Sequence, residues 1–96
     1  MLKQKEKEII EQAESYLAII MPNFVKDPQR IEGCNYAEKC GKIMYAIVQD
    51  GTEWDKFKEY NWRKIYHTWI VTPELIRSVV KEINEDMKFF KGSGGK

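Results

Sequence analysis

Residues 63–72 read RKIYHTWIVT, and the conformation of this stretch decides the fold class of the chain. β-Branched and aromatic residues are enriched in strands, and they are dense here. The apolar residues of the wider segment nevertheless recur at spacings that fit a helix, namely Trp54, Phe57, Ile65 and Trp69. We expect a helix beginning near Thr52, with a short extended segment near residues 69–71. Helix and strand both remain open for residues 63–72.

The residues that follow this stretch indicate a helix start. Thr72 is a suitable N-cap, Pro73 is favoured at the first helical position, and Glu74 lies near the positive end of the helix dipole. The apolar stripe of this helix is Ile76, Val79, Val80, Ile83, Met87 and Phe90. Gly92 is the predicted stop. We therefore expect a single helical domain over residues 1–91 and a flexible tail over residues 92–96.

Two further helices are predicted upstream. The first ends near Met21, because a proline disfavours helical geometry in the residue before it. The apolar positions at helical spacing in this first segment are Leu2, Ile9, Ala13, Leu17, Ile20 and Phe24. Asp27 followed by Pro28 predicts a second helix from Pro28 to about Gln49. Asn35 with Glu38 resembles a capping box and marks a competing, later start of this helix. Its stripe is Ile31, Cys34, Ala37, Met44 and Val48. The predicted fold is all-α, a compact bundle of about four helices.

Composition limits the classes of function. The chain of 96 residues carries 16 Lys plus Arg against 15 Asp plus Glu, a formal net charge of +1. Nucleic acids and anionic membranes usually select a clear basic excess. The longest apolar run is far shorter than the roughly 20 residues of a membrane span, so no membrane partner is expected. The low number of cysteines, two, and the polar residues at the N-terminus favour a cytoplasmic location.

Residue types that carry catalysis or bind metals are sparse. The soft ligands are Cys34, Cys40 and His67, and five residues separate the two cysteines, which does not fit a zinc site. We interpret both cysteines as unpaired structural thiols that pack as small hydrophobes. The sequence has no phosphate-binding glycine loop, nucleophile elbow or zincin motif. We expect no catalytic residues, no metal and no cofactor, and hence not an enzyme.

Arg63 and His67 form the one pair with a family resemblance. An arginine and a histidine on one helical turn resemble the RNase motif of HEPN domains, which are small four-helix proteins. Arg63 and His67 enclose three residues, fewer than that motif places between them. The resemblance covers these two residues and implies a HEPN-like nuclease as a second alternative function.

Small residues recur at steps of four in the predicted second helix, at Gly33, Ala37 and Gly41. Two glycines inside a soluble helix cost about 2 kcal/mol relative to alanine, so something should approach this strip closely. The approaching element is either another helix of the same chain or a second copy of it. The second case predicts a homodimer through Gly33, Ala37 and Gly41.

Aromatic crowding gives the candidate functional surface. Half of the aromatic residues fall within residues 54–69, interleaved with basic residues, and one helix cannot bury them all on one face. The expected partner-binding residues are Trp62, Arg63, Tyr66, His67 and Trp69. Aromatic and basic mixtures occur at protein interfaces and on single-strand nucleic-acid platforms.

The leading function is therefore a small non-enzymatic interaction protein, acting as a masking, adaptor or inhibitor domain on a protein partner or on itself. The alternative is an RNA or single-stranded DNA binding protein that uses the same surface. Packing of these aromatics in the core alone remains open. The Lys-, Ile- and Glu-rich composition suits an AT-rich genome and thus a microbial or phage accessory protein.

Overall fold

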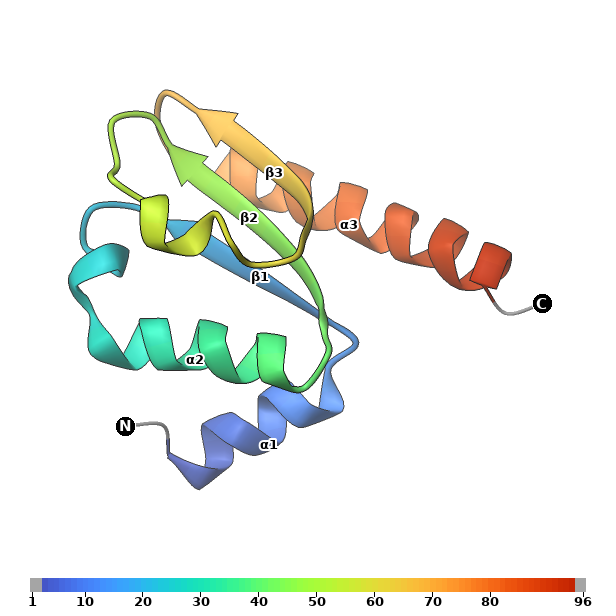
Figure 1. The fold of residues 1–96 in the computed structure, drawn as a ribbon. Coiled ribbons are helices and arrows are strands. Elements are labelled where there is room, and N and C mark those ends of the chain that lie inside the picture. Colours follow the sequence, from blue (N-terminus) through green and yellow to red (C-terminus); the bar gives the residue numbers. More distant parts are fainter. Residues whose placement is uncertain (1–2, 95–96) are drawn as a thin grey trace.

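The computed structural model describes the backbone of residues 3–94, where helices pack against a parallel sheet (Figure 1). The helices and strands in chain order are α1 (Gln4–Gln12), β1 (Ser15–Ile20), α2 (Pro28–Lys39), β2 (Ile43–Gln49), β3 (Trp62–Thr68) and α3 (Pro73–Gly94). Short 3-10 turns occupy Phe24–Lys26 and Asp55–Phe57. The fold is mixed α/β, so the predicted all-α bundle is wrong.

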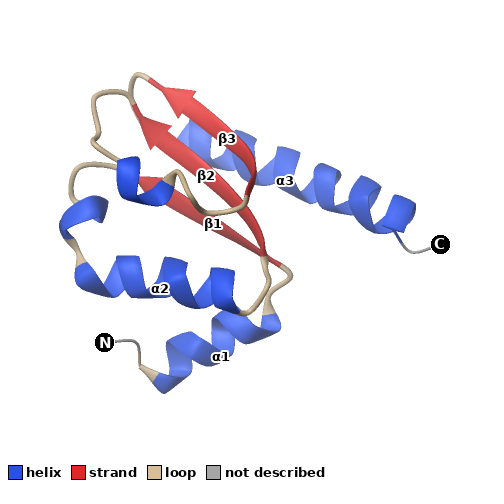
Figure 2. Cartoon of the chain, in the orientation of Figure 1, coloured by secondary structure: helices blue, strands red, loops and turns tan. Residues whose placement is uncertain are grey.

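The strands of the described chain are ordered β1-β2-β3, and both pairings are parallel. Figure 2 shows α1 and α2 on one side of the sheet and α3 on the other. The connections that lead from β1 to β2 and from β2 to β3 contribute to the same hydrophobic cluster, through Ala37 and Phe57 respectively. Because both crossovers lie on one face of a sheet with this strand order, they share one hand.

β2 is a strand because its residues are apolar on both faces, as expected for the central strand of a covered parallel sheet. Met44, Ala46 and Val48 pack in the cluster on the α2 side, and Tyr45 and Ile47 pack under α3. The predicted helix from Pro28 to Gln49 is therefore correct at its start and wrong beyond Lys39. It ends early because Gly41, with φ of 74°, turns the chain out of the helix.

The predicted first helix also divides into two elements. α1 ends at Gln12, and β1 pairs in register with β2 from Ser15 opposite Ile43 to Ile20 opposite Val48. Ala18 and Ile20 point to the α2 side, whereas Leu17 and Ile19 point to α3. The helical spacing of Leu17 and Ile20 was coincidental, because these two side chains lie on opposite faces of a strand. Leu2, expected on the same stripe, lies outside the described residues.

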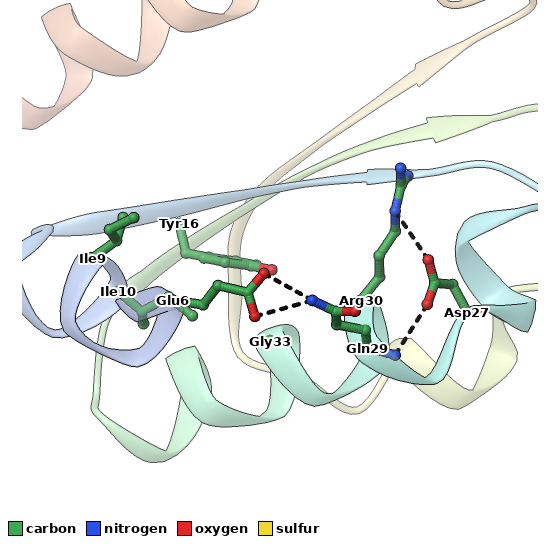
Figure 3. A pocket seen from close by; sticks show the side chains of 8 residues that line it. All are labelled: Glu6, Ile9, Ile10, Tyr16, Asp27, Gln29, Arg30 and Gly33. Carbon is green, nitrogen blue, oxygen red and sulfur yellow. Dashed lines mark hydrogen bonds and ion pairs between the residues drawn. The ribbon is translucent and has the colours of Figure 1, made fainter. Parts of the chain in front are cut away.

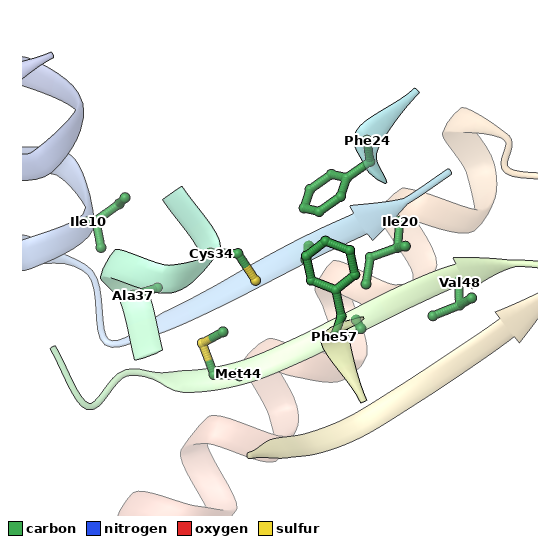
Figure 4. Close-up of a cluster of buried hydrophobic side chains, with 10 residues drawn as sticks. Ile10, Ile20, Phe24, Cys34, Ala37, Met44, Val48 and Phe57 are labelled. Carbon is green, nitrogen blue, oxygen red and sulfur yellow. The ribbon is translucent and has the colours of Figure 1, made fainter. Parts of the chain in front are cut away.

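A hydrophobic core lies on each face of the sheet. Figure 4 shows the larger one, beneath α2, where the rings of Phe24 and Phe57 meet edge to face with centroids 5.6 Å apart. Its buried members are Ile10, Ala18, Ile20, Phe24, Cys34, Ala37, Met44, Ala46, Val48 and Phe57. The second core contains Tyr45, Ile47, Val79, Ile83 and Met87. Together they hold α2 and α3 to opposite faces.

The predicted start of the last helix is confirmed. The backbone N–H of Leu75 donates to Oγ1 of Thr72 at 3.1 Å, which caps the first turn of α3. The helix continues through Gly92, its predicted stop, to Gly94. Residues 95 and 96 of the expected tail lie outside the described residues. No helix within residues 3–94 is long and apolar enough to cross a membrane.

The stretch that decides the fold is a strand. β3 covers Trp62–Thr68, and the extended segment expected at residues 69–71 is the loop that follows it. The helix expected from Thr52 is limited, in this part of the described chain, to the 3-10 turn Asp55–Phe57. Residues 63–68 form a strand rather than a helix because their strand propensity is high and because they pair with β2.

Candidate functional site

The candidate site lies at the outer edge of β3. β3 lies at the end of the sheet, and within residues 3–94 no strand lies beyond it. The carbonyl of Thr68 accepts a hydrogen bond from the Asp50 N–H at 2.8 Å, so Thr68 points its backbone groups inward. Backbone groups alternate in direction along a strand. The N–H and C=O of Ile65 and His67 therefore point outward, to the open edge.

The amino end of this edge is protected by a bulge and by charge. The register between β2 and β3 shifts at Met44/Tyr45, where Arg63 is the extra residue. Arg63 and Lys64 then both reach Asp86 of α3, with Arg63 Nε at 2.6 Å from Oδ2 and Lys64 Nζ at 3.6 Å from Oδ1. Bulges and charged side chains are two of the devices by which sheet edges avoid unwanted pairing.

Asp86 holds this end of β3 to α3. Its side chain is 10% exposed, and Tyr45 donates its hydroxyl to Oδ2 at 2.6 Å. The hydrogen bonds from Arg63 and then Tyr45 hold the pKa of the Asp86 carboxyl well below its usual range. The positive charges of Arg63 and Lys64 are thus engaged within the molecule.

The carboxyl end of the edge has no such protection in the described chain. Ile65 is 38% exposed, and the loop directly after the strand presents Trp69, 82% exposed, and Ile70, 59% exposed. Thr68 Oγ1 donates to the Ile70 carbonyl at 2.8 Å and so closes the turn that carries Trp69. An open half-strand followed by an exposed tryptophan is the least ordinary surface of the fold.

The partner-binding residues predicted from the sequence do not form one surface. Trp62 lies on the α2 side, where its Nε1 donates to the Phe57 carbonyl at 2.6 Å. Tyr66 is half-buried on the α3 side, and His67 is exposed on the α2 side. The alternation of a strand separates side chains that a helix would have grouped. Trp69, with 82% of its surface exposed, is the one tryptophan of the predicted set that lies mostly in solvent.

Two exposed residues of this surface were missed by sequence reasoning, Ile65 and Ile70. Ile65 was assigned to the buried stripe of a helix. β3 does not alternate apolar and polar residues, and Ile70 lies in the loop after the strand, so no pattern in the sequence marked either residue as exposed.

The geometry required by the nuclease resemblance is also absent from β3. Arg63 reaches α3 on one face of the sheet, whereas the ring of His67 packs against Trp54 on the other, with centroids 5.9 Å apart. The two side chains therefore do not lie on one helical turn.

The small-residue strip is interrupted. Gly33 and Ala37 are buried in α2 of the same chain, and Gly41 is exposed in the turn after this helix. The predicted second-copy contact at Gly33, Ala37 and Gly41 has no continuous helical face on which to form.

The two cysteines differ from each other. Cys34 is buried beneath α2, and burial raises the pKa of its thiol to about 12. Cys40 is exposed at the end of α2, so its expected role as a small buried hydrophobe is wrong. Both thiols are unpaired. Among the described residues, no group of three or more His, Cys, Asp or Glu side chains is placed to hold a metal ion.

A cavity of about 430 Å³ lies between α1 and the start of α2 (Figure 3). The Glu6 carboxylate accepts hydrogen bonds from Gln29 Nε2 at 3.0 and 2.8 Å, and Asp27 pairs with Arg30 Nε at 3.4 Å. The charged side chains Glu6, Asp27 and Arg30 in the cavity wall are thus already paired with other side chains of this chain. Nothing in the cavity therefore indicates a ligand.

Comparisons of the chain with protein-family models, curated proteins and solved structures found no match. The function is therefore inferred from the geometry of β3 and the loop that follows it.

Proposed function

We propose that this protein is a non-enzymatic interaction domain that binds a protein partner along the open edge of β3. The observation that carries the proposal is the unprotected half-strand Ile65–Thr68, followed by Trp69 with 82% of its surface exposed. A partner strand would pair with the outward backbone groups of Ile65 and His67, and its side chains would contact Trp69 and Ile70.

This mode of binding draws on two general properties. Strand addition to a sheet edge gains affinity from main-chain hydrogen bonds and specificity from neighbouring side chains. Exposed tryptophans are enriched among the residues that dominate binding energy at protein interfaces. The bulge at the amino end of β3 would limit main-chain hydrogen bonding to Ile65 and His67.

The nucleic-acid alternative is supported less well. Binding of nucleic acids depends on Lys and Arg that neutralise phosphates, whereas Arg63 and Lys64 both contact Asp86. The whole chain carries a formal charge of only +1. A steep loss of oligonucleotide affinity with salt would nevertheless favour this alternative.

A reducing compartment, such as the cytoplasm, is part of the proposal. It is supported by the unpaired thiols of Cys34 and Cys40, because disulfides are favoured in oxidising compartments.

Site-specific crosslinking in the source cell tests the proposal. A photoreactive amino acid replaces Ile70 in one variant and Ile9, an exposed residue of α1, in the control. We expect a protein adduct of defined mass from position 70 and none from position 9. Equal adducts from both positions, or none, would contradict the proposal, and a nuclease-sensitive adduct would favour the nucleic-acid alternative.

His67→Pro should abolish the adduct, because it removes an N–H that points outward. Proline is tolerated in edge strands where the N–H side faces solvent. His67→Ala is the matched control, since it removes the same imidazole and keeps the N–H.

A further inference from the structure

We infer that the strand that pairs with β3 is β3 of a second copy, so that two chains form one continuous six-stranded sheet. The pairing is antiparallel, about a two-fold axis that passes next to Tyr66. The inference rests on the proposed function, because it names the partner of that same edge.

This register uses the alternation of backbone groups in β3. A two-fold axis at Tyr66 places Ile65 of one copy opposite His67 of the other. Both residues direct N–H and C=O to the open edge, as the inward bond of the Thr68 carbonyl requires. Each pair would then exchange both of its backbone hydrogen bonds, and every outward group of Ile65 and His67 would be satisfied. A parallel pair cannot have this symmetry, because a two-fold axis across the sheet reverses the strand direction.

The distribution of charge is compatible with self-pairing. In this register Lys64 lies opposite Thr68 of the second copy and Ile65 opposite His67, so no Lys or Arg of the strand faces another. Asp86 contacts both Arg63 and Lys64, which further reduces repulsion between two copies. An acidic partner strand would gain little from Arg63 and Lys64, because both side chains already contact Asp86.

The exposed apolar side chains favour β3 over the opposite edge of the sheet. Among the described strand residues, Ile65 is the large hydrophobic side chain with the highest exposure, and Trp69 and Ile70 continue its edge. The corresponding apolar residues of β1, Leu17 and Ile19, pack against the α3 cluster instead. Dimer formation at β3 would therefore cover apolar surface that the monomer leaves in water.

Light scattering and sedimentation over a concentration series test the inference. We expect a concentration-dependent dimer for the unmodified protein and a monomer for His67→Pro, whereas His67→Ala, which keeps the outward N–H, should weaken the dimer far less. Trp69→Ala should raise the dimer dissociation constant about 30-fold, the effect of a hot-spot residue, and Ile9→Ala should leave it unchanged. Hydrogen exchange of the Ile65 and His67 amides should slow as the concentration rises.

Two results would overturn the inference. One is an unmodified protein that remains monomeric at the highest concentration, and the other is a dimer that His67→Pro does not weaken. If the protein is monomeric but a different protein is crosslinked from position 70, self-pairing is excluded and the proposed function stands. A monomer that also yields no adduct at position 70 would overturn both.

Discussion

Arg63 on β3 and Asp86 on α3 form a two-point contact across the sheet–helix interface, Nε to Oδ2 at 2.6 Å and Nη2 to Oδ1 at 3.1 Å. The bulge in β3 makes it possible, because an extra residue turns Arg63 and Lys64 toward the same carboxylate. The contact fixes α3 to the edge strand, and it engages the charges that would otherwise dominate the amino end of β3.

The first prediction concerns acid stability. Arg63 and Tyr45 keep the pKa of Asp86 below its usual range, so the ionised carboxylate stabilises the fold above about pH 4, the pKa of an unfolded aspartate. This contribution is lost as the pH falls through the lower pKa of the folded state. Asp86→Asn should therefore lower the melting temperature at neutral pH and flatten its dependence on acid pH. Asp55→Asn, which alters an exposed ion pair with Lys58, is the control and should change neither.

The second prediction concerns the thiols. Cys40 is exposed and Cys34 is buried, with burial raising the pKa of the Cys34 thiol to about 12. Because the thiolate is the reactive species, a maleimide should label Cys40 in the native protein and Cys34 only after unfolding. Mass spectrometry of tryptic peptides would measure both rates. Rapid native labelling of Cys34 would show that α2 opens readily from the sheet.

Local capping chemistry made two helix starts predictable. Asp27 accepts a hydrogen bond from the Gln29 N–H at 3.0 Å, and Thr72 accepts one from the Leu75 N–H at 3.1 Å. Both signals lie within a few residues and need no tertiary neighbour. Gly41 is an equally local stop signal, but the apolar residues after it also fit one face of a longer helix.

The strands could not be assigned with the same rules. A strand covered on both faces loses the alternation that marks a half-buried one, and β2 shows this, with Met44 and Tyr45 both fully buried on opposite sides. β1 and β3 depend on β2 for their pairing, and these partners are distant in the sequence. The same holds for the candidate site. The sequence indicates Trp69 as a candidate, but only the pairing of β3 with β2 shows that Trp62 and Tyr66 lie on opposite faces of the sheet.

The third prediction concerns alkaline unfolding. Burial is the main cause that raises the pKa of Tyr16, Tyr45 and Tyr60 to about 12 each. An unfolded tyrosine loses its proton near pH 10, so the folded state, which holds the proton longer, loses stability as the pH rises from about 10 to 12. Tyrosinate absorbance and loss of circular dichroism should appear together.

Tyr16→Phe should move this alkaline transition to higher pH, because one fewer buried hydroxyl must stay protonated. Tyrosinate absorbance that develops near pH 10 with unchanged circular dichroism would show that these rings are accessible in the folded state.

The fourth prediction separates packed from exposed aromatics. Trp62 packs on the α2 side with its Nε1–H bonded to the Phe57 carbonyl, and its ring lies 5.6 Å from that of Tyr60. Trp62→Ala should therefore lower the free energy of unfolding by about 2 kcal/mol. Trp69→Ala should change it by less than about 0.5 kcal/mol, because 82% of that side chain is already in water.

Phe57→Ala is the reference for a core residue in this comparison. Its side chain is 1% exposed and joins the two aromatic contacts beneath α2, so its truncation should cost about 3–5 kcal/mol. Urea unfolding followed by circular dichroism would rank the variants, with Trp69→Ala least affected and Phe57→Ala most. If Trp69→Ala lost as much stability as Trp62→Ala, the loop after β3 would pack in the monomer, and Trp69 would have no free surface to offer a partner.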